Sequence, residues 1–214
     1  MPIYVSLDSA DVWSQAELFQ LDEQLNPLAV AGVPPDFFAQ DGQLWGFPLY
    51  AWEKHQQTDY KWWSQRTKHL FKMFDLLRFD HFRAIEAYWS VPAHHPTARH
   101  GQWVKAPGKA LLSALKKVKP SGLIAENLGD ISKEVEELRK EFKIPGMAIF
   151  QFGFGGHPLS NHLPHFVENG DVYYSGTHDN EVISGWLETL SDDACRHICK
   201  YYGIEKDQIN VEFI

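Results

Sequence analysis

Three short apolar runs of the chain each end in a carboxylate. The first run ends at Asp80, the second at Glu126 and the third leads to Asp179. A short apolar run flanked by helix-like sequence predicts a buried strand, and a charge at the end of such a strand is costly unless it is paired. Because the carboxyl ends of parallel strands meet at one mouth, we expect the three carboxylates to converge there.

These carboxylates are suited to cleaving a glycosidic bond. Cleavage with retention needs two carboxyl groups roughly 5 Å apart, one as nucleophile and one as acid. Arg78 lies two residues before Asp80 and therefore on the same strand face, where it orients that carboxylate and favours its ionised form. Glu126 follows the apolar residues 123–125, and burial there raises the pKa of a carboxyl group, as an acid requires. A satisfied ion-pair network at the strand ends is the structural alternative.

Long motifs surround the three carboxylates and continue along the chain. They are RFDHFR at 78–83, LIAENLG at 123–129 and VYYSGTHDN at 172–180. Further motifs are PIYV at 2–5, DSADVW at 8–13, VAGVPPD at 30–36, GQLWG at 42–46, EAYW at 86–89 and PGM at 145–147. Together they resemble, in the same order, the catalytic segments of the amylomaltases, the 4-α-glucanotransferases of glycoside hydrolase family 77. The resemblance runs from residue 2 to about residue 190.

The resemblance implies a role for each residue of the site. Asp80 is expected to be the nucleophile, Glu126 the acid/base, and Asp179 the carboxylate that binds sugar hydroxyls and favours the distorted ring. The residues expected to bind substrate are Arg78, His81, His178, Asp36, Trp45, Asn127 and Asn180. The implied substrate is a malto-oligosaccharide or a glucan derived from starch or glycogen. Neither a cofactor nor a metal is implied.

Strand-like and helix-like runs alternate along the chain, which predicts an α/β fold with parallel strands and outer helices. The expected strands cover residues 3–7, 75–80, 122–127, 146–154 and 171–176. The expected helices cover residues 59–74, 108–118, 132–142, 181–190 and 191–203.

The resemblance further implies that residues 1–214 form a single, incomplete (β/α) barrel domain of the TIM type. The strand at residues 3–7 matches the third strand of the family's barrel. The first two strands are therefore expected to be missing from this chain, and the eighth strand as well. Sheet edges without neighbours recruit partners, so we expect self-association through them.

Residues 8–50 are expected to be irregular, and residues 27–50 among them to form a loop that overhangs the active site. Loops of this length in a compact domain are usually functional, and the aromatic residues Phe37, Phe38, Trp45 and Phe47 do not suit a merely solvated connector. In the family, the matching loop overhangs the sugar groove, where it would exclude water and position the acceptor. Phe47 stands where that loop commonly has Asn. The spacing of the residues does not by itself separate a transferase from a hydrolase.

Composition narrows the classes of partner. The chain has 214 residues and a formal net charge of −8, which argues against nucleic acid or an anionic membrane. No apolar run reaches 18 residues and the first residues show no signal-peptide pattern, so a cytoplasmic protein is expected, with a plastid location open for a longer parent protein. Cys195 and Cys199 are expected to be free thiols, and the histidines of residues 94–100 to lie in a solvated loop.

Three functions are open at this point. The first is transfer of α-1,4-glucan segments between malto-oligosaccharides, favoured by the three carboxylates, with the isolated piece weak or inactive. The second is an inactive, truncated carbohydrate-binding remnant, or a piece that needs a missing partner segment, suggested by the absent start of the barrel. The third is a metal-dependent hydrolase, prompted by the pairs Asp80-His81 and His178-Asp179, although no expected strand offers a His-x-His pair.

Overall fold

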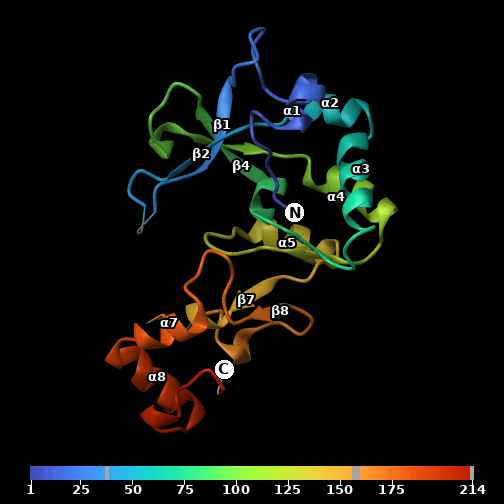
Figure 1. The fold of residues 1–214 in the computed structure, drawn as a ribbon. Helices are drawn as coiled ribbons and strands as arrows, with labels where there is room; N and C mark the ends of the chain where they lie inside the picture. Colours follow the sequence, from blue (N-terminus) through green and yellow to red (C-terminus); the bar gives the residue numbers. More distant parts are fainter. Residues whose placement is uncertain (37–38, 156–159, 213–214) are drawn as a thin grey trace. The chain divides into compact units, whose positions relative to one another are not determined.

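The computed structural model describes residues 1–36, 39–155 and 160–212, and it divides into two compact units (Figure 1). The first unit is Met1–Ile144 and the second is Pro145–Ile214. Both units combine short strands with helices, so the chain has an α/β fold. Parallel and antiparallel strand pairs both occur, in separate sheets.

The strands are β1 (Ala29–Val33), β2 (Gln43–Pro48), β3 (Leu77–Phe79), β4 (Ala87–Pro92), β5 (Gln102–Lys105), β6 (Leu123–Ala125), β7 (Met147–Ile149) and β8 (Val172–Tyr174). The helices are α1 (Ala10–Ser14), α2 (Trp52–Gln57), α3 (Lys61–Leu70), α4 (Gly108–Val118), α5 (Lys133–Glu141), α6 (Phe150–Gly153), α7 (Ile183–Glu188) and α8 (Asp192–Tyr202). Single turns of 3-10 helix occur at η1 (Ala16–Leu18), η2 (Phe82–Ile85), η3 (Ala98–His100), η4 (Pro164–Phe166) and η5 (Lys206–Gln208).

The parallel pair β3–β6 confirms two of the expected strands. Leu77 lies opposite Leu123, and Phe79 lies opposite Ala125. Along β3, Leu77 and Phe79 are buried while Arg78 between them is half-buried. This alternation is the period of a strand with one face on the core. It places Arg78 on the other face, together with the residue that follows the strand, Asp80.

The first unit also contains a four-stranded antiparallel sheet that the sequence did not predict. Its strand order is β2-β1-β4-β5 (Figure 1). Residues 27–50 are therefore not an irregular loop, because β1 pairs with both β2 and β4. Val30 and Ala31 of β1 are buried, which supplies the apolar contact that fixes the strand. The expected aromatic residues Phe37 and Phe38 lie outside the described residues.

The prediction of a strand over residues 3–7 is wrong. The N-terminal segment lies beside β3 through one parallel bridge, Pro2 to Asp80, and the Asp80 amide donates to the Met1 carbonyl oxygen at 2.9 Å. Beyond this bridge the segment leaves the sheet. Tyr4 is buried and stacks on Tyr50, with ring centroids 6.1 Å apart. Aromatic packing has replaced strand pairing for this part of the chain.

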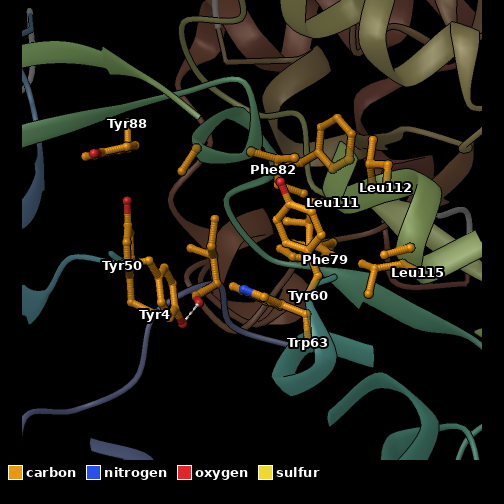
Figure 2. Packing of buried hydrophobic residues seen from close by; sticks show 14 of the residues in the cluster. Tyr4, Tyr50, Tyr60, Trp63, Phe79, Phe82, Tyr88, Leu111, Leu112 and Leu115 are labelled. Carbon is orange, nitrogen blue, oxygen red and sulfur yellow. Dashed lines mark hydrogen bonds between the residues drawn. The ribbon is translucent and has the colours of Figure 1, made fainter. Parts of the chain in front are cut away.

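Aromatic rings and leucines form the core of the first unit (Figure 2). Trp63 of α3 stacks on Phe79 of β3, with ring centroids 5.8 Å apart and planes 23° apart. Phe79 in turn meets Phe82 edge to face at 6.3 Å. From α4, Leu111, Leu112 and Leu115 are fully buried, a pattern that matches one face of a helix. The core thus anchors β3, whose end carries Asp80.

The predicted helices of the first unit are confirmed. The expected helix over residues 108–118 coincides with α4, and those over 59–74 and 132–142 contain α3 and α5. In contrast, β4 and β5 occupy residues for which no strand was expected. Short strands on an antiparallel sheet can face water on one side, so their composition need not be apolar.

The second unit is built around the parallel pair β7–β8. Met147 lies opposite Val172, and Ile149 lies opposite Tyr174. The strand expected over residues 146–154 ends at Ile149, because the chain then turns into α6. There Phe150 and Phe154 pack together with centroids 4.9 Å apart. The helices expected over residues 181–190 and 191–203 are confirmed as α7 and α8.

In the described parts of the chain, no helix combines the length and the apolar character that crossing a bilayer requires.

His55 generates a prediction about stability and pH. Its side chain is fully buried, and its Nε2 lies 3.1 Å from the Leu18 carbonyl oxygen. Burial lowers the pKa of His55 from 6.5 to about 4. His55 therefore takes up a proton near pH 6.5 in the unfolded chain but only near pH 4 in the folded chain. The folded state consequently loses stability as the pH falls through this window.

We expect His55→Gln to remove this pH dependence. Between pH 7 and pH 4.5 the wild-type chain should lose about 2 kcal/mol more unfolding free energy than the variant. Urea unfolding at both pH values measures the difference. His69→Gln, at an exposed position of α3, controls for the loss of an imidazole as such. Equal losses in wild type and His55→Gln would contradict the assignment.

Candidate active site

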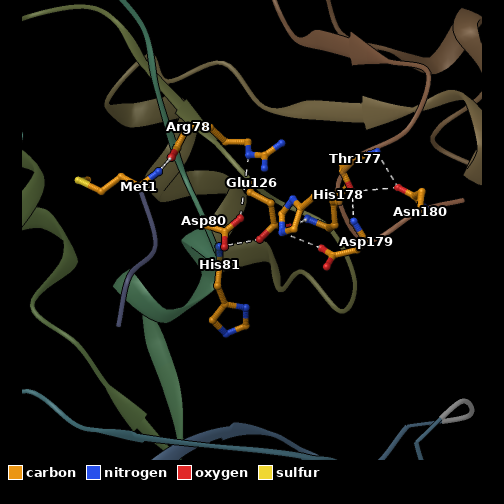
Figure 3. A network of polar contacts seen from close by, with 10 residues as sticks. Met1, Arg78, Asp80, His81, Glu126, Thr177, His178, Asp179 and Asn180 are labelled. Atoms are coloured by element: carbon orange, nitrogen blue, oxygen red, sulfur yellow. Dashed lines mark hydrogen bonds and ion pairs between the residues drawn. The ribbon is translucent and has the colours of Figure 1, made fainter. Parts of the chain in front are cut away.

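Asp80 and Glu126 lie at the ends of two hydrogen-bonded parallel strands. Because Phe79 pairs with Ala125, the next residue of each strand carries one of the two carboxylates. The Glu126 amide donates to the Phe79 carbonyl oxygen at 2.9 Å, and the Phe82 amide donates to the Glu126 carbonyl oxygen at 3.0 Å. The expectation that these two carboxylates meet at one edge is correct (Figure 3).

Two backbone amides hold the Glu126 carboxylate. The His81 amide donates to its Oε2 at 2.6 Å, and the Leu128 amide donates to its Oε1 at 2.8 Å. His81 has φ 53° and ψ 54°, in the left-handed region, a conformation that a non-glycine residue seldom adopts. Such conformations occur where the surrounding structure fixes them, often at functional sites.

Burial raises the pKa of Glu126 and is the largest influence on it. The amides of Leu128 and His81 act in the opposite direction because they stabilise the ionised form. The charge of Asp80 raises the pKa further, and that of Arg78 lowers it. The net effect is upward, which favours a carboxyl group that keeps its proton longer than a free glutamate does.

Asp80 has more polar surroundings than Glu126. Its side chain is 38% exposed, and the Arg78 Nε lies 4.0 Å from its Oδ1. Arg78 and Asp80 extend from the same face of β3, as expected from their spacing. The guanidinium beside it orients the Asp80 carboxylate. The two carboxylates therefore have different environments, and the raised pKa of Glu126 suits an acid.

His81 turns its ring toward Trp45 of β2. The two rings meet edge to face with centroids 4.7 Å apart. Burial lowers the pKa of His81 to about 4, and the nearby charge of Arg83 acts in the same direction. The imidazole is therefore neutral near pH 7, with one nitrogen able to donate and the other to accept a hydrogen bond.

A cleft of about 510 Å³ opens beside these groups. Asp80 and His81 line it together with Trp45, Phe47 and Arg66. Residues 2–6 complete the wall of the cleft. Among them, Tyr4 stacks on Phe47 with ring centroids 6.5 Å apart. Aromatic rings with a few polar groups are the usual lining of a small-molecule site. The expected site residues Trp45, His81 and Asp80 are thus brought to one cleft.

Two other residues expected to bind substrate, Asp36 and Asn127, form hydrogen bonds within the chain. Asp36 is exposed and closes a turn, because its Oδ1 accepts from the Ala39 amide at 2.6 Å. Asn127 donates from Nδ2 to the Glu136 Oε1 at 2.9 Å. Arg139, which is buried, donates to the other oxygen of Glu136. The sequence did not indicate this network, although an Arg-Glu pair at i,i+3 on a helix was a signal for it.

The second unit presents the remaining candidates on the loop after β8. Asn180 Oδ1 accepts from the Thr177 amide at 2.8 Å and from the Thr177 hydroxyl at 2.9 Å. Next to it, the His178 Nε2 lies 3.4 Å from the Asp179 Oδ2 (Figure 3). Asp179 is 80% exposed at its side chain. This carboxylate lies on the loop that follows β8 (Val172–Tyr174) and not directly at the strand end, and its convergence with Asp80 and Glu126 stays a prediction.

Among residues 1–36, 39–155 and 160–212, no group of three or more His, Cys, Asp or Glu side chains has a geometry that could hold a metal ion. The rings of His94 and His95 are tilted against each other with centroids 4.4 Å apart, and those of His95 and His100 are tilted with centroids 4.9 Å apart. Cys195 and Cys199 are free thiols on α8.

Comparison with known protein families shows to which family this chain belongs. The model of glycoside hydrolase family 77, described as 4-alpha-glucanotransferase, matches residues 1–214. The chain belongs to this family.

Named members of the 4-alpha-glucanotransferase family are similar along the whole chain. The 4-alpha-glucanotransferase of Aquifex aeolicus is 50% identical over 100% of this chain and 44% of its own length. A chloroplastic/amyloplastic 4-alpha-glucanotransferase of Arabidopsis thaliana is 46% identical over 95% of this chain and 36% of its own. The chain therefore spans about two-fifths of the length of these relatives.

A solved amylomaltase has the same fold. The structure of amylomaltase from Streptococcus agalactiae in complex with acarbose is 43% identical and superposes with a TM-score of 0.89. The match covers 96% of this chain and 42% of that one. The resemblance drawn from the sequence motifs is thus confirmed at the level of the family.

The electrostatic coupling within the site generates a prediction. Because the charge of Asp80 raises the pKa of Glu126, Asp80→Asn is expected to lower it. Carboxyl-carbon NMR titration of the Glu126 side chain measures the shift. Asp59→Asn, an exposed carboxylate that pairs with Lys117, is the matched control and should leave the Glu126 titration unchanged. An unchanged or higher pKa in Asp80→Asn would show that the two carboxylates are not coupled.

Proposed function

We propose that the protein containing this chain is a 4-α-glucanotransferase that moves α-1,4-glucan segments between malto-oligosaccharides with retention. The observation that carries the proposal is the pair Asp80 and Glu126, which occupy adjacent strand ends, Asp80 beside Arg78 and Glu126 with a raised pKa, in a chain of the 4-alpha-glucanotransferase family. The family supplies the substrate class, and the site supplies the two groups that the reaction requires.

The reaction runs in two displacements. In the first, an Asp80 oxygen attacks the anomeric carbon while Glu126 gives its proton to the glycosidic oxygen, so that the reducing-end part of the donor leaves and a glycosyl ester remains on Asp80. In the second, the Glu126 carboxylate takes the proton of the acceptor 4-hydroxyl, whose oxygen attacks the anomeric carbon and releases Asp80. Two inversions give net retention, and the steps use no cofactor.

The amides of His81 and Leu128 suit the dual role of Glu126. They fix both of its oxygens and so hold the same group in place while it alternates between acid and base. Arg78 keeps the Asp80 carboxylate oriented before attack and neutralises part of its charge. The proton of Glu126 and the charge of Asp80 are therefore each supported by neighbouring groups.

The substrate is held, in this proposal, by the residues that the family resemblance implies. Neutral His81 bonds sugar hydroxyls from beside Trp45, and Asp179 binds hydroxyls and favours the distorted ring. Of the other implied residues, Arg78, Asp36, His178 and Asn180 are proposed to contact the substrate, whereas the side chain of Asn127 is bonded to Glu136. Asn180, whose amide oxygen closes the loop at Thr177, orients that loop as well.

Transfer instead of hydrolysis requires that a sugar hydroxyl reach the glycosyl ester before water does. Trp45 and Phe47 of β2 give the cleft an apolar wall. An apolar wall has little affinity for water, but it packs well against the apolar face of a sugar ring. We propose that the segment 27–50, although it contains strands, overhangs the site and favours the sugar acceptor in this way.

We further propose that both units belong to one (β/α) barrel domain of the TIM type. The support is the likeness to amylomaltase over 96% of the chain, together with the two parallel strand pairs. The relatives are more than twice as long, so the first strands and the eighth strand of that barrel are proposed to come from sequence outside residues 1–214. A chain without them would associate through its open sheet edges. A cytoplasmic location is proposed, with a plastid for a plant parent protein.

Activity toward maltotriose tests the proposal. The full-length protein should convert maltotriose into glucose and longer malto-oligosaccharides, and both Asp80→Asn and Glu126→Gln should reduce the rate by at least about 10³-fold. Asp75→Asn, an exposed carboxylate before β3, is the control and should retain the rate. Full activity of Glu126→Gln would disprove the acid/base assignment, and glucose and maltose alone as products would indicate a hydrolase.

A fluoride donor separates the two roles. Fluoride leaves without a proton, so Glu126→Gln should still form the glycosyl ester from an α-maltosyl fluoride, whereas Asp80→Asn should not. Mass spectrometry of the protein detects the ester. An assay of the 214-residue chain beside the full-length protein tests the alternative that this chain is a binding remnant. Weak or absent turnover with retained binding of maltotriose would support a dependence on the missing segments.

A further inference from the structure

A buried arginine anchors one side of the loop that carries Glu126. Arg139 of α5 is only 4% exposed. Its Nε and Nη2 donate to the Glu136 Oε2 at 3.0 and 2.8 Å, and its Nη1 donates to the Ile144 carbonyl oxygen at 3.1 Å. A forked guanidinium bound at three points has little freedom, and charge-assisted bonds of this kind are the strong ones. The Glu136 carboxylate is thereby fixed in place.

The second oxygen of Glu136 reaches the site loop. Its Oε1 accepts from the Asn127 Nδ2 at 2.9 Å. Asn127 lies between Glu126 and Leu128 in the chain, so its backbone torsions set the direction of the Leu128 amide. That amide donates to the Glu126 Oε1 at 2.8 Å. A continuous series of bonds therefore leads from the core of α5 to the carboxylate.

We propose that Arg139, Glu136 and Asn127 form a positioning relay that holds Glu126 in its productive place. The inference rests on the proposed function, in which Glu126 is the acid/base. None of the three needs to touch the substrate. Asn127 acts through the backbone of the loop, Glu136 through Asn127, and Arg139 through Glu136. Supports of this kind decide whether a reacting group is placed to within about half an ångström.

The relay has a distinct electrostatic consequence. The Leu128 amide stabilises the ionised form of Glu126, so a loop released from Glu136 would lose that stabilisation and the pKa of Glu126 would rise. The charged groups of the first unit that act on Glu126 are Asp80, which raises its pKa, and Arg78, which lowers it. Neither is changed by substitutions in the relay. A purely structural ion pair on α5 would affect stability and leave the titration of Glu126 unchanged.

Asn127→Ala in the full-length protein tests the relay at the end nearest the site. Carboxyl-carbon NMR should show a higher pKa for Glu126. The rate constant kcat for maltotriose disproportionation should fall by about 10- to 100-fold with KM within about twofold. Because the acid must be protonated, the decline of kcat/KM at high pH should move upward with the pKa.

Glu136→Gln should change the same quantities in the same direction, because a neutral amide cannot accept from both Asn127 and Arg139 as the carboxylate does. Glu137→Gln is the matched control, since Glu137 is the next residue of α5 and pairs with Lys133 at the surface. If Glu136→Gln does not fold, Asn127→Ala alone decides the matter.

The inference and the proposed function fail in different ways. An unchanged Glu126 titration in Asn127→Ala would overturn the relay whatever the enzyme does, and so would a kcat within twofold of wild type. Loss of activity accompanied only by a lower melting temperature, with the decline of kcat/KM at its original pH, would also overturn it. In contrast, a wild-type protein without transferase activity would refute the proposed function, and the NMR titration would still test the relay.

Discussion

The parallel pairing of β3 with β6 is the interaction on which the candidate site depends. It aligns Phe79 with Ala125, and the residues that follow, Asp80 and Glu126, thereby become neighbours. Strand pairing is fixed by the buried faces of both strands, since a slip by one residue would turn the apolar side chains to the other face. The core that holds Phe79 against Trp63 therefore also holds the spacing of the two carboxylates.

Different surroundings then give two similar carboxyl groups different chemistry. Glu126 is half-buried and desolvation raises its pKa, although two amides partly offset this effect. Asp80 remains partly exposed beside Arg78. The same offsetting amides make Glu126 suitable for both halves of a double displacement, because an acid that was desolvated without any donor would be a poor base in the second half. The site thus depends on a balance of opposing effects on a single group.

The sequence predicted the parallel strands and the helices better than the antiparallel sheet. The runs ending at Asp80 and Glu126 are apolar and short, and both are strands because each is buried by helices. The segment 3–7 has an equally strand-like composition, yet Tyr4 packs on Tyr50 instead. Strands β4 and β5 could not be predicted, since their pairing joins residues whose patterns only make sense once the partner strand is known.

The candidate site shows the same division between local and distant information. Motif spacing led to Asp80, Glu126 and Arg78, because each follows or lies in a recognisable strand. The support behind Glu126 was not predictable in this way, since Arg139 is on a helix whose charged residues look like a solvated face. Only burial shows otherwise: an arginine that is 4% exposed must have partners, and these partners lead through Glu136 to the loop of Glu126. Residues that position a reacting group are therefore found from the packing around it, after the reacting group itself has been found from the sequence.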